Sequence, residues 1–385
     1  MPTLSVIIPA YNERANLTEL FDRLAAVLSE IDYEILVVDD DSPDGTASLA
    51  RSIAQQNARV RTLQRVGRTG LSSAVVEGML ATSSPYIAVM DADMQHDEAI
   101  LPEMLNTLKR DNLDLVIGSR NISGGSMGEF ASHRVALSQL GRRLSRAVCR
   151  AELSDPMSGY FMVTRAYLQE VVHSLSCIGF KILVDLVASS RRPVRFAEVA
   201  YTFRNRHHGE SKLDVVVGLE FLELLLDKMI RGWIPVSYLI FSMVGALGLV
   251  LNVVIVYVFL RLGSASFEVS QSAAALVVIA LNFFINNRLT FRSTRLRGVG
   301  MWHGLLLFYL ACSVGLVFNL AAAHGFRSFG LAWYFASFAG TVVGSVWNYL
   351  MTSLFVWRIR RRRQARLQVT REAAYQAAPI ATFDR

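Results

Sequence analysis

Carboxylates that could hold a divalent cation follow a short apolar run in the first third of the chain. Residues 86–90 read YIAVM, and residues 91–97, DADMQHD, hold three aspartates. A short apolar run that ends in acids is typical of a buried parallel strand whose carboxyl end opens onto a crevice. In extended backbone Asp91 and Asp93 point the same way, so both can approach one ion. The pattern predicts a cation site here, and a solvated loop is the alternative interpretation.

Two further groups of acids follow apolar runs nearer the N-terminus. Glu13 follows the run at 4–8, and three aspartates at 39–41 follow the run at 34–38. A parallel sheet would bring all three groups to one carboxyl edge. A site crowded with carboxylates would repel a ligand such as a diphosphate. A divalent cation is therefore expected between the carboxylates and such a ligand. The simpler alternative for residues 42–45, SPDG, is a turn with a helix cap.

Strand-like and helix-like patterns alternate through the first half of the chain. We predict strands at 4–8, 34–38, 60–63, 86–90 and 114–118, and helices at 15–29, 47–56 and 71–81. This alternation predicts an α/β fold with a mostly parallel, Rossmann-like sheet and helices on both faces. The chain has neither a GxGxxG after a strand nor a GxxxxGK[ST] motif, so a glycine-rich phosphate cradle is not expected.

The C-terminal part of the chain is strongly apolar. The mean hydropathy of +0.34 and the hydrophobic fraction of 52% are high for a purely soluble protein. Four stretches contain no Asp, Glu, Lys or Arg, namely residues 234–260, 269–287, 298–326 and 328–357. As a helix, each is long enough to cross a hydrocarbon core of about 30 Å. We therefore predict four membrane-spanning helices.

The distribution of arginines orients these helices. The connection after the second apolar stretch carries four arginines and no acid, and the tail after residue 357 is also rich in arginine. By the positive-inside rule, both termini and the middle connection face the cytoplasm, and the N-terminus lacks the basic leader of a signal peptide. We interpret the net charge of +7 as suited to contact with anionic lipid rather than with nucleic acid. Three cysteines without a CxxC pair predict neither a disulfide framework nor a zinc site.

Four motifs together resemble family 2 glycosyltransferases of the GT-A fold. They are PAYNE at 9–13, VVDDDSPDGT at 37–46, GLSSA at 70–74 and DADMQH at 91–96. The greatest likeness is to polyprenyl-phosphate sugar synthases of the dolichyl-phosphate mannose synthase type, over residues 3 to about 215. More loosely, residues 234–357 resemble the four-span GtrA-like transmembrane domain, with NFFINNRLTF at 282–291 as the best stretch.

The resemblance implies an inverting glycosyltransferase that uses Mg²⁺ or Mn²⁺. It would transfer a monosaccharide, in the first place mannose from GDP-mannose, to dolichyl or polyprenyl phosphate at the cytoplasmic face of a membrane. A UDP-sugar donor, such as UDP-glucose, is the alternative within this class. A sugar-lipid flippase or scaffold, whose soluble domain only binds the nucleotide, is the alternative of another class. The sequence predicts neither the chain length of the acceptor nor the oligomeric state.

The same resemblance implies roles for individual residues. The metal ligands would be Asp91, Asp93 and Gln95, and the catalytic residues Asp91, Asp93, Arg120 and Arg204. The substrate-binding residues would be Pro9, Tyr11, Glu13, Val38, Asp39, Asp40, Asp91, Ala92, Asp93, Gln95, Arg120, Arg134, Ser138, Arg204 and Lys212. The arginines suit phosphate because guanidinium binds it bidentately.

Two features weaken parts of this assignment. The stretch 132–150, which holds Arg134 and Ser138, has an amphipathic basic pattern, and such a helix could rest on lipid headgroups alone. Asp185 stands where relatives usually carry glutamate, which leaves its role open. The expected organisation is a GT-A catalytic domain at 1–212, an interfacial helix and linker at 213–233, the four-span domain at 234–357 and a basic cytoplasmic tail at 358–385.

Overall fold

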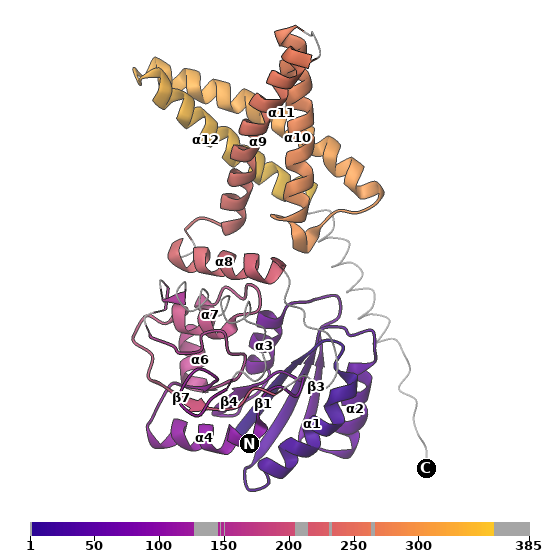
Figure 1. The fold of residues 1–385 in the computed structure, drawn as a ribbon, viewed down its shortest axis with the longest axis vertical. Helices are drawn as coiled ribbons and strands as arrows, with labels where there is room; N and C mark the ends of the chain where they lie inside the picture. Colours follow the sequence, from indigo (N-terminus) through magenta and orange to yellow (C-terminus); the bar gives the residue numbers. More distant parts are fainter. Residues whose placement is uncertain are drawn as a thin grey trace. The chain divides into compact units, whose positions relative to one another are not determined.

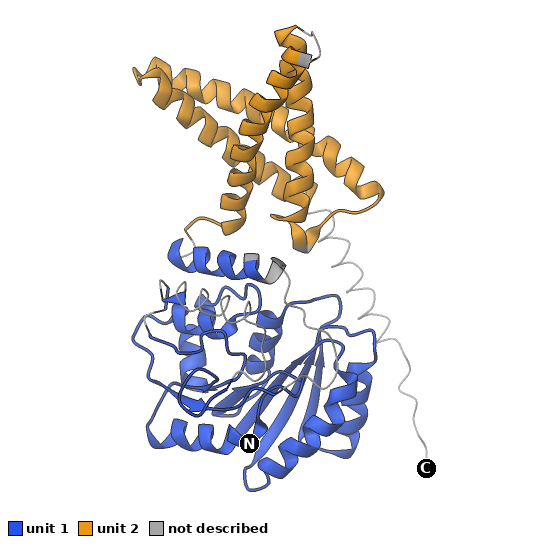
Figure 2. Ribbon diagram, viewed as in Figure 1, with its two compact units in different colours: residues 1–232 blue, residues 233–385 orange. Residues whose placement is uncertain are grey.

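The computed structural model describes residues 2–126, 145–146, 148–149, 151–204, 215–230, 233–262 and 266–357. The chain divides into two compact units, residues 1–232 and 233–385 (Figure 2). The acid-rich motifs lie in unit 1 and the long apolar helices in unit 2. Arg134, Ser138, Lys212 and the basic tail lie outside the described residues.

Unit 1 is built on a seven-stranded sheet of order β3-β2-β1-β4-β6-β5-β7 within its described residues. The strands are β1 (Leu4–Ala10), β2 (Tyr33–Asp39), β3 (Val60–Gln64), β4 (Tyr86–Val89), β5 (Leu115–Ser119), β6 (Phe161–Thr164) and β7 (Phe196–Ala200). All neighbouring pairs are parallel except those of β6, which runs antiparallel to β4 and β5. The predicted mostly parallel α/β sheet is confirmed, whereas β6 and β7 have no counterpart among the predicted strands.

Helices cover both faces of this sheet (Figure 1). They are α1 (Arg14–Val27), α2 (Thr46–Gln56), α3 (Leu71–Leu80), α4 (Leu101–Arg110), α6 (Arg165–Val171) and α7 (Ile182–Ser189). Val6 and Ile8 of β1 pack in one core with α1, α2 and α4, while Ile7 packs in a second core with α3, α6 and α7. Because both faces of β1 are covered, its sequence is a continuous apolar run and not an alternating one.

Helix α8 (Val215–Ile230) packs on the second core of unit 1. Phe221, Leu224 and Leu225 are buried there, whereas Leu222 is 46% exposed and Met229 is 62% exposed. One side of α8 therefore packs on the domain, and its other side presents large apolar groups.

Asp185 ties α7 to α8. Its carboxylate is fully buried and pairs with the Lys228 ammonium of α8 at 2.6 Å. It also accepts hydrogen bonds from the backbone N–H groups of Ser176 and Cys177, at 3.1 and 2.8 Å. The role that the sequence left open is thus an internal one: Asp185 anchors α8 to the sheet domain.

The described part of unit 2 contains the helices α9 (Val236–Leu262), α10 (Phe267–Arg288), α11 (Val299–Ser328) and α12 (Trp333–Met351), with a π-helical turn at Thr352–Val356. Three of them, over Val236–Arg261, Phe267–Arg288 and Val299–Ser328, are long and apolar enough to cross a membrane. The fourth predicted span forms α12, a helix of 19 residues in which tryptophan, tyrosine and asparagine lower the apolar character. Three of the four predicted spans therefore form helices that meet both the length and the hydropathy criterion. The fourth predicted span is also a helix, but it does not meet both.

Asn287, in the stretch that resembles the GtrA-like domain, connects the end of α10 to Trp357, which follows the π-helical turn after α12. Its Oδ1 accepts hydrogen bonds from Leu296 N at 2.8 Å and from Trp357 Nε1 at 3.1 Å. The Trp357 ring stacks on Phe291 with centroids 3.9 Å apart. Because a buried amide is costly without partners, these bonds fix how the ends of the helices meet.

Candidate active site

The strand order places three acid-bearing loops at one edge of the sheet. β1 lies between β2 and β4, with Ala10 opposite Asp39 and Ile7 opposite Val89. Asp40 N donates to Ala10 O at 3.0 Å, and Met90 N donates to Ile7 O at 3.2 Å, so the pairing continues just past the strand ends. The loops that carry Glu13, the aspartates 39–41 and the aspartates 91–93 therefore leave from neighbouring strand ends.

Hydrogen bonds join the first two of these loops. Asn12, in a left-handed conformation with φ of 60°, donates its backbone N–H to Ser42 Oγ at 2.9 Å. Ser42 Oγ in turn donates to Asp39 Oδ1 at 2.5 Å, and Glu13 N donates to Thr46 Oγ1 at 3.1 Å. Asp39 is fully buried and directed at its own turn. The turn interpretation thus holds for Ser42, which supports the loop that holds Glu13.

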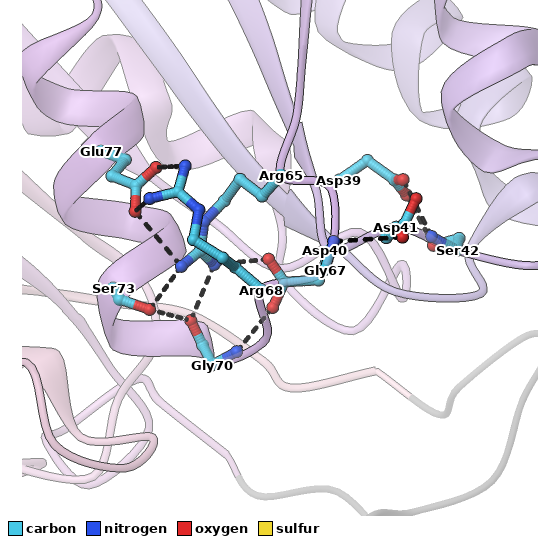
Figure 3. Close-up of polar contacts among 10 residues, drawn as sticks. All are labelled: Asp39, Asp40, Asp41, Ser42, Arg65, Gly67, Arg68, Gly70, Ser73 and Glu77. Carbon is cyan, nitrogen blue, oxygen red and sulfur yellow. Dashed lines mark hydrogen bonds and ion pairs between the residues drawn. The ribbon is translucent and has the colours of Figure 1, made fainter. Parts of the chain in front are cut away.

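Asp40 uses both carboxylate oxygens to hold a third loop (Figure 3). Its Oδ1 accepts from Arg65 Nη1 at 2.5 Å and its Oδ2 from Gly70 N at 2.7 Å. Arg65 is 2% exposed and also donates to Ser73 Oγ at 2.6 Å. Burial raises the pKa of Asp40, against the opposing effect of its bonds to Gly70 and Arg65. Asp40, predicted to lie near the nucleotide pocket, therefore supports the loop between β3 and α3.

Asp41 binds the same loop from its other end. Its carboxylate accepts from Gln64 Nε2 at 2.9 Å. It also accepts from Gly67 N at 3.2 Å (Figure 3). Of three consecutive aspartates, one therefore stabilises its own turn, and two stabilise the loop after β3.

The DADMQH motif forms a tight turn organised by the His96 ring. Met94 adopts a left-handed conformation with φ of 64°, and His96 Nδ1 accepts a hydrogen bond from Asp91 N at 3.1 Å. The ring is stacked on Tyr160, with centroids 4.9 Å apart and planes 13° from parallel. Burial lowers the pKa of His96 to about 4, so the ring is neutral at pH 7.

The tautomer of His96 follows from this bond. Because Nδ1 is the acceptor, the proton of the neutral ring resides on Nε2. Nε2 lies 3.8 Å from Asp91 Oδ2, too far for a hydrogen bond, and a neutral ring forms no ion pair. His96 is thus a support for the backbone of Asp91.

The predicted metal ligands present oxygen donors that fit Mg²⁺ or Mn²⁺. The Asp91 side chain is 37% exposed, and Asp93 Oδ1 accepts from Gln95 N at 3.2 Å. Gln95 donates Nε2 to Arg204 O at 3.2 Å, which leaves its Oε1 without a partner among the described residues. No group of three or more His, Cys, Asp or Glu suited to a metal occurs in the described parts of the chain. Two carboxylates and one amide oxygen match a hard cation that completes its shell with water and phosphate.

Arg120 is held rigidly beside this turn. Its Nε and Nη2 donate to Asp155 at 2.7 and 2.9 Å, and the guanidinium lies 4.9 Å from the centre of the Phe203 ring. Burial opposes the charge of Arg120, but the bonds to fully buried Asp155 outweigh it and raise the pKa of the guanidinium. Its Nη1 has no hydrogen-bond partner among the described residues. This arrangement leaves one edge of a fixed cation for an anion.

Arg204 was expected to bind phosphate, but its guanidinium is bonded to two carboxylates of the protein. Its backbone adjoins Gln95, because Arg204 N donates to Gln95 O at 2.9 Å. Its guanidinium binds two acids just after the turn, Asp97 at 2.7 Å and Glu98 at 2.8 Å. A phosphate at this position would have to share Arg204 with both carboxylates.

Sequence reasoning did not single out Asp155 or Lys181. Neither follows a predicted strand, and both reach the sheet edge on loops from distant parts of the chain. The single available signal for Asp155 is a lone acid in the turn-forming stretch DPMSG at 155–159. Gly159 in that stretch packs so closely that a Cβ there would lie 3.1 Å from Asp91 Oδ2.

Comparison with known proteins matches each of the two units to a known protein family. The model of "Glycosyl transferase family 2" matches residues 5–172, and that of the "GtrA/DPMS, transmembrane domain" matches residues 240–357. The dolichol-phosphate mannosyltransferase of Pyrococcus furiosus is 33% identical over 365 residues, which is 92% of this chain and 99% of the relative. That of Saccharomyces cerevisiae is 35% identical over 232 residues, 58% of this chain and 85% of the relative.

Among solved structures, glucosyl-3-phosphoglycerate synthase from Mycobacterium tuberculosis, in complex with Mn²⁺, UDP and phosphoglyceric acid, aligns with a TM-score of 0.45. It is 20% identical, and the alignment covers 61% of this chain and 80% of the synthase. The match to the Pyrococcus relative extends over nearly the full length of both chains, through the sheet domain and the apolar helices. This membrane protein therefore belongs to the dolichol-phosphate mannosyltransferase family of family 2 glycosyltransferases.

Proposed function

We propose that this protein transfers mannose from GDP-mannose to dolichyl or polyprenyl phosphate at the face of a membrane. The observation that carries the proposal is the relationship to the Pyrococcus mannosyltransferase through both units. The site geometry supports it, because two carboxylates and an amide oxygen lie on a fixed turn near the rigid cation Arg120.

The acceptor needs little chemical activation. A phosphate monoester has a second pKa of about 6, so the attacking oxygen is already anionic near neutrality and needs no general base. The protein has to bring two anions together and hold them in line. Arg120 suits this task because Asp155 and Phe203 fix its direction while Nη1 stays open. Mg²⁺ or Mn²⁺ at Asp91, Asp93 and Gln95 would stabilise the negative charge of the departing nucleotide diphosphate.

The remaining binding residues complete the proposed site. Pro9, Tyr11, Glu13 and Asp39 come from the ends of β1 and β2 and would line the nucleotide pocket. Val38 and Ala92 stay predictions for substrate binding. Arg134, Ser138 and Lys212, which lie outside the described residues, stay predictions for phosphate binding.

The proposed orientation has the catalytic domain and both termini in the cytoplasm. It rests on the arginine-rich connection between α10 and α11 and on the arginine-rich tail. Apolar Leu222 and Met229 on the exposed side of α8 support contact of unit 1 with the membrane interface. The expected division at 1–212, 213–233, 234–357 and 358–385 is part of this proposal. The main role proposed for the apolar helices is to anchor the enzyme and position its acceptor.

A donor panel tests this function. Purified full-length protein in detergent is incubated with polyprenyl phosphate, Mn²⁺ or Mg²⁺, and GDP-mannose, UDP-glucose or UDP-galactose in turn. We expect metal-dependent release of GDP and formation of a mannolipid with GDP-mannose alone. Preferential turnover of a UDP-sugar would contradict the donor assignment. Nucleotide binding without transfer from any donor would favour a scaffold or flippase.

A further inference from the structure

Lys181 is a partly buried cation with an incomplete set of partners. Its Nζ donates to Met157 O at 3.3 Å, and this carbonyl is its single hydrogen-bond partner in the described parts of the chain. No carboxylate of the described residues lies within 4.0 Å of the ammonium. Lys228, by contrast, pairs with Asp185 at 2.6 Å. A partly buried ammonium usually has a closer counter-charge, because removing it from water is costly.

The charges around Lys181 are those of the candidate site. Burial lowers the pKa of Lys181, the Arg120 charge lowers it further, and Asp91 and Asp155 act in the opposite direction. Both oxygens of Asp155 are already bonded to Arg120. If Asp91 binds the divalent cation, no other acid that acts on Lys181 in the described parts of the chain remains to balance its charge. Lys181 and Arg120 lie close enough for their charges to interact, and the carboxylate of Asp155 is already bonded to Arg120.

The position of Lys181 links α8 to the metal-binding turn. Gly179, two residues earlier, contacts Glu220 of α8, since a Cβ on Gly179 would lie 2.9 Å from Glu220 Cβ. On its other side Lys181 binds Met157, and Gly159 of the same loop is packed against Asp91. Lys181 is therefore placed between the helix that presents apolar groups and the turn that would hold the sugar nucleotide.

We propose that Lys181 binds a phosphate oxygen of one of the two reacting anions, and its place beside α8 favours the phosphate of the lipid acceptor. This inference rests on the proposed function. A lysine binds phosphate as a point charge and can follow the group as it moves, whereas Arg120 is fixed by Asp155. The two residues would together offset the repulsion between the acceptor and the donor diphosphate.

Kinetics of Lys181→Met and Lys181→Arg test the proposal, with Lys109→Met as the matched control. Lys109 is exposed at the end of α4 and lies over the Tyr86 ring, away from the acid-bearing loops. We expect Lys181→Met to raise the KM for polyprenyl phosphate by about tenfold or more, the size of one charged hydrogen bond. GDP affinity, measured by calorimetry, should stay unchanged. Lys181→Arg should recover most of the loss, and Lys109→Met should match the wild type.

The two sources of phosphate give different results. A tenfold weaker GDP affinity with an unchanged acceptor KM would assign Lys181 to the donor diphosphate. A folded Lys181→Met protein with both quantities within twofold of the wild type would overturn the proposal. A melting curve of each variant in detergent shows whether it is folded.

Chemical labelling gives a readout that does not need turnover. The chain has four lysines, at 109, 181, 212 and 228, so acetylation of each can be followed by mass spectrometry. Polyprenyl phosphate should protect Lys181 and leave Lys109 labelled as before, and equal labelling of Lys181 with and without it would count against the acceptor as the source. If the wild type transfers no sugar, the proposed function fails, while protection by polyprenyl phosphate or by GDP still tests Lys181.

Discussion

His96 Nδ1 accepts the backbone N–H of Asp91 across 3.1 Å, so one neutral ring closes the turn that carries both predicted metal-binding carboxylates. The ring is stacked on Tyr160 and is 3% exposed. The direction of the Asp91 side chain therefore depends on a residue that the sequence pattern favoured as a loop residue over a metal ligand. Supporting residues of this kind usually matter for metal affinity almost as much as the ligands do.

Two substitutions separate the hydrogen bond of His96 from its packing. His96→Asn keeps an acceptor close to the position of Nδ1, and His96→Phe keeps the ring but removes the acceptor. We expect His96→Phe to weaken Mn²⁺ binding about tenfold, as measured by electron paramagnetic resonance in the presence of GDP. His96→Asn should recover most of the affinity. Equal losses in the two variants would show that packing, and not the bond to Asp91, is decisive.

Asp93→Asn should abolish metal-dependent transfer while the fold stays intact. Asn retains an oxygen that can accept the bond from Gln95 N, so the turn is preserved, but the charge that attracts the cation is lost. We expect a loss of turnover of about a hundredfold or more and an unchanged melting temperature in detergent. Near-normal turnover of the purified variant would refute the metal assignment.

The Arg65–Asp40 pair should show strong energetic coupling. Arg65→Met leaves a buried carboxylate without its cation, which costs about 3–5 kcal/mol in comparable buried pairs. The double variant Arg65→Met with Asp40→Asn should be more stable than Arg65→Met alone, because it removes the unpaired charge and keeps an acceptor for Gly70 N. Thermal unfolding of the four proteins measures this coupling, and additive losses would contradict it.

The pH dependence of Arg65→Met follows from the raised pKa of Asp40. An acid whose pKa is higher in the folded state binds more protons there, so stability increases as the pH falls. Without Arg65 this effect should grow, because a stabilising positive charge is lost. The melting temperature of Arg65→Met should therefore approach that of the wild type toward acidic pH, and a constant gap would count against an ionised Asp40.

Asp155→Asn and Asp114→Asn distinguish positioning from stability. Asp155 holds Arg120 in the site, whereas Asp114 holds Arg192 and Arg195 at 2.7 and 3.0 Å near the start of β5. We expect both variants to melt at lower temperature, but only Asp155→Asn to lower kcat/KM for transfer, by roughly tenfold or more. A comparable loss of transfer in Asp114→Asn would show that reduced stability alone explains the effect.

Asp114 also predicts an acid-sensitive contribution to stability. Burial opposes its charge, but bonds from Arg192 and Arg195 outweigh this and lower the pKa of Asp114 from 3.8. A depressed carboxyl pKa stabilises the fold above the unfolded value, and this contribution is lost as the pH falls through the folded pKa. The stability difference between the wild type and Asp114→Asn should therefore be full at pH 7 and shrink below pH 3.8. A difference independent of pH would contradict the ion pairs.

The local sequence pattern was sufficient to predict the mostly parallel sheet of unit 1 and the apolar helices of unit 2. Continuous apolar runs, each followed by acids, predicted the strands β1, β2 and β4 and the edge at which they end, because buried parallel strands have few other sequences available. The resemblance to family 2 glycosyltransferases rested on the motifs of the same loops, and the full-length relatives confirm it. Uninterrupted apolar stretches likewise predicted the helices of unit 2.

Only the tertiary structure decided how neighbouring acids divide their work. Asp39, Asp40 and Asp41 look equivalent along the sequence, yet Asp39 bonds to Ser42 of its own turn. Asp40 and Asp41 instead bond to Arg65 and Gly67, which belong to the loop after β3. The sequence around Asp155 and Lys181 does not indicate a role for either residue, because that role depends on contacts between residues far apart in the chain. A sequence pattern reports burial and chain direction, whereas the role of a charge depends on which opposite charge the folded chain places beside it.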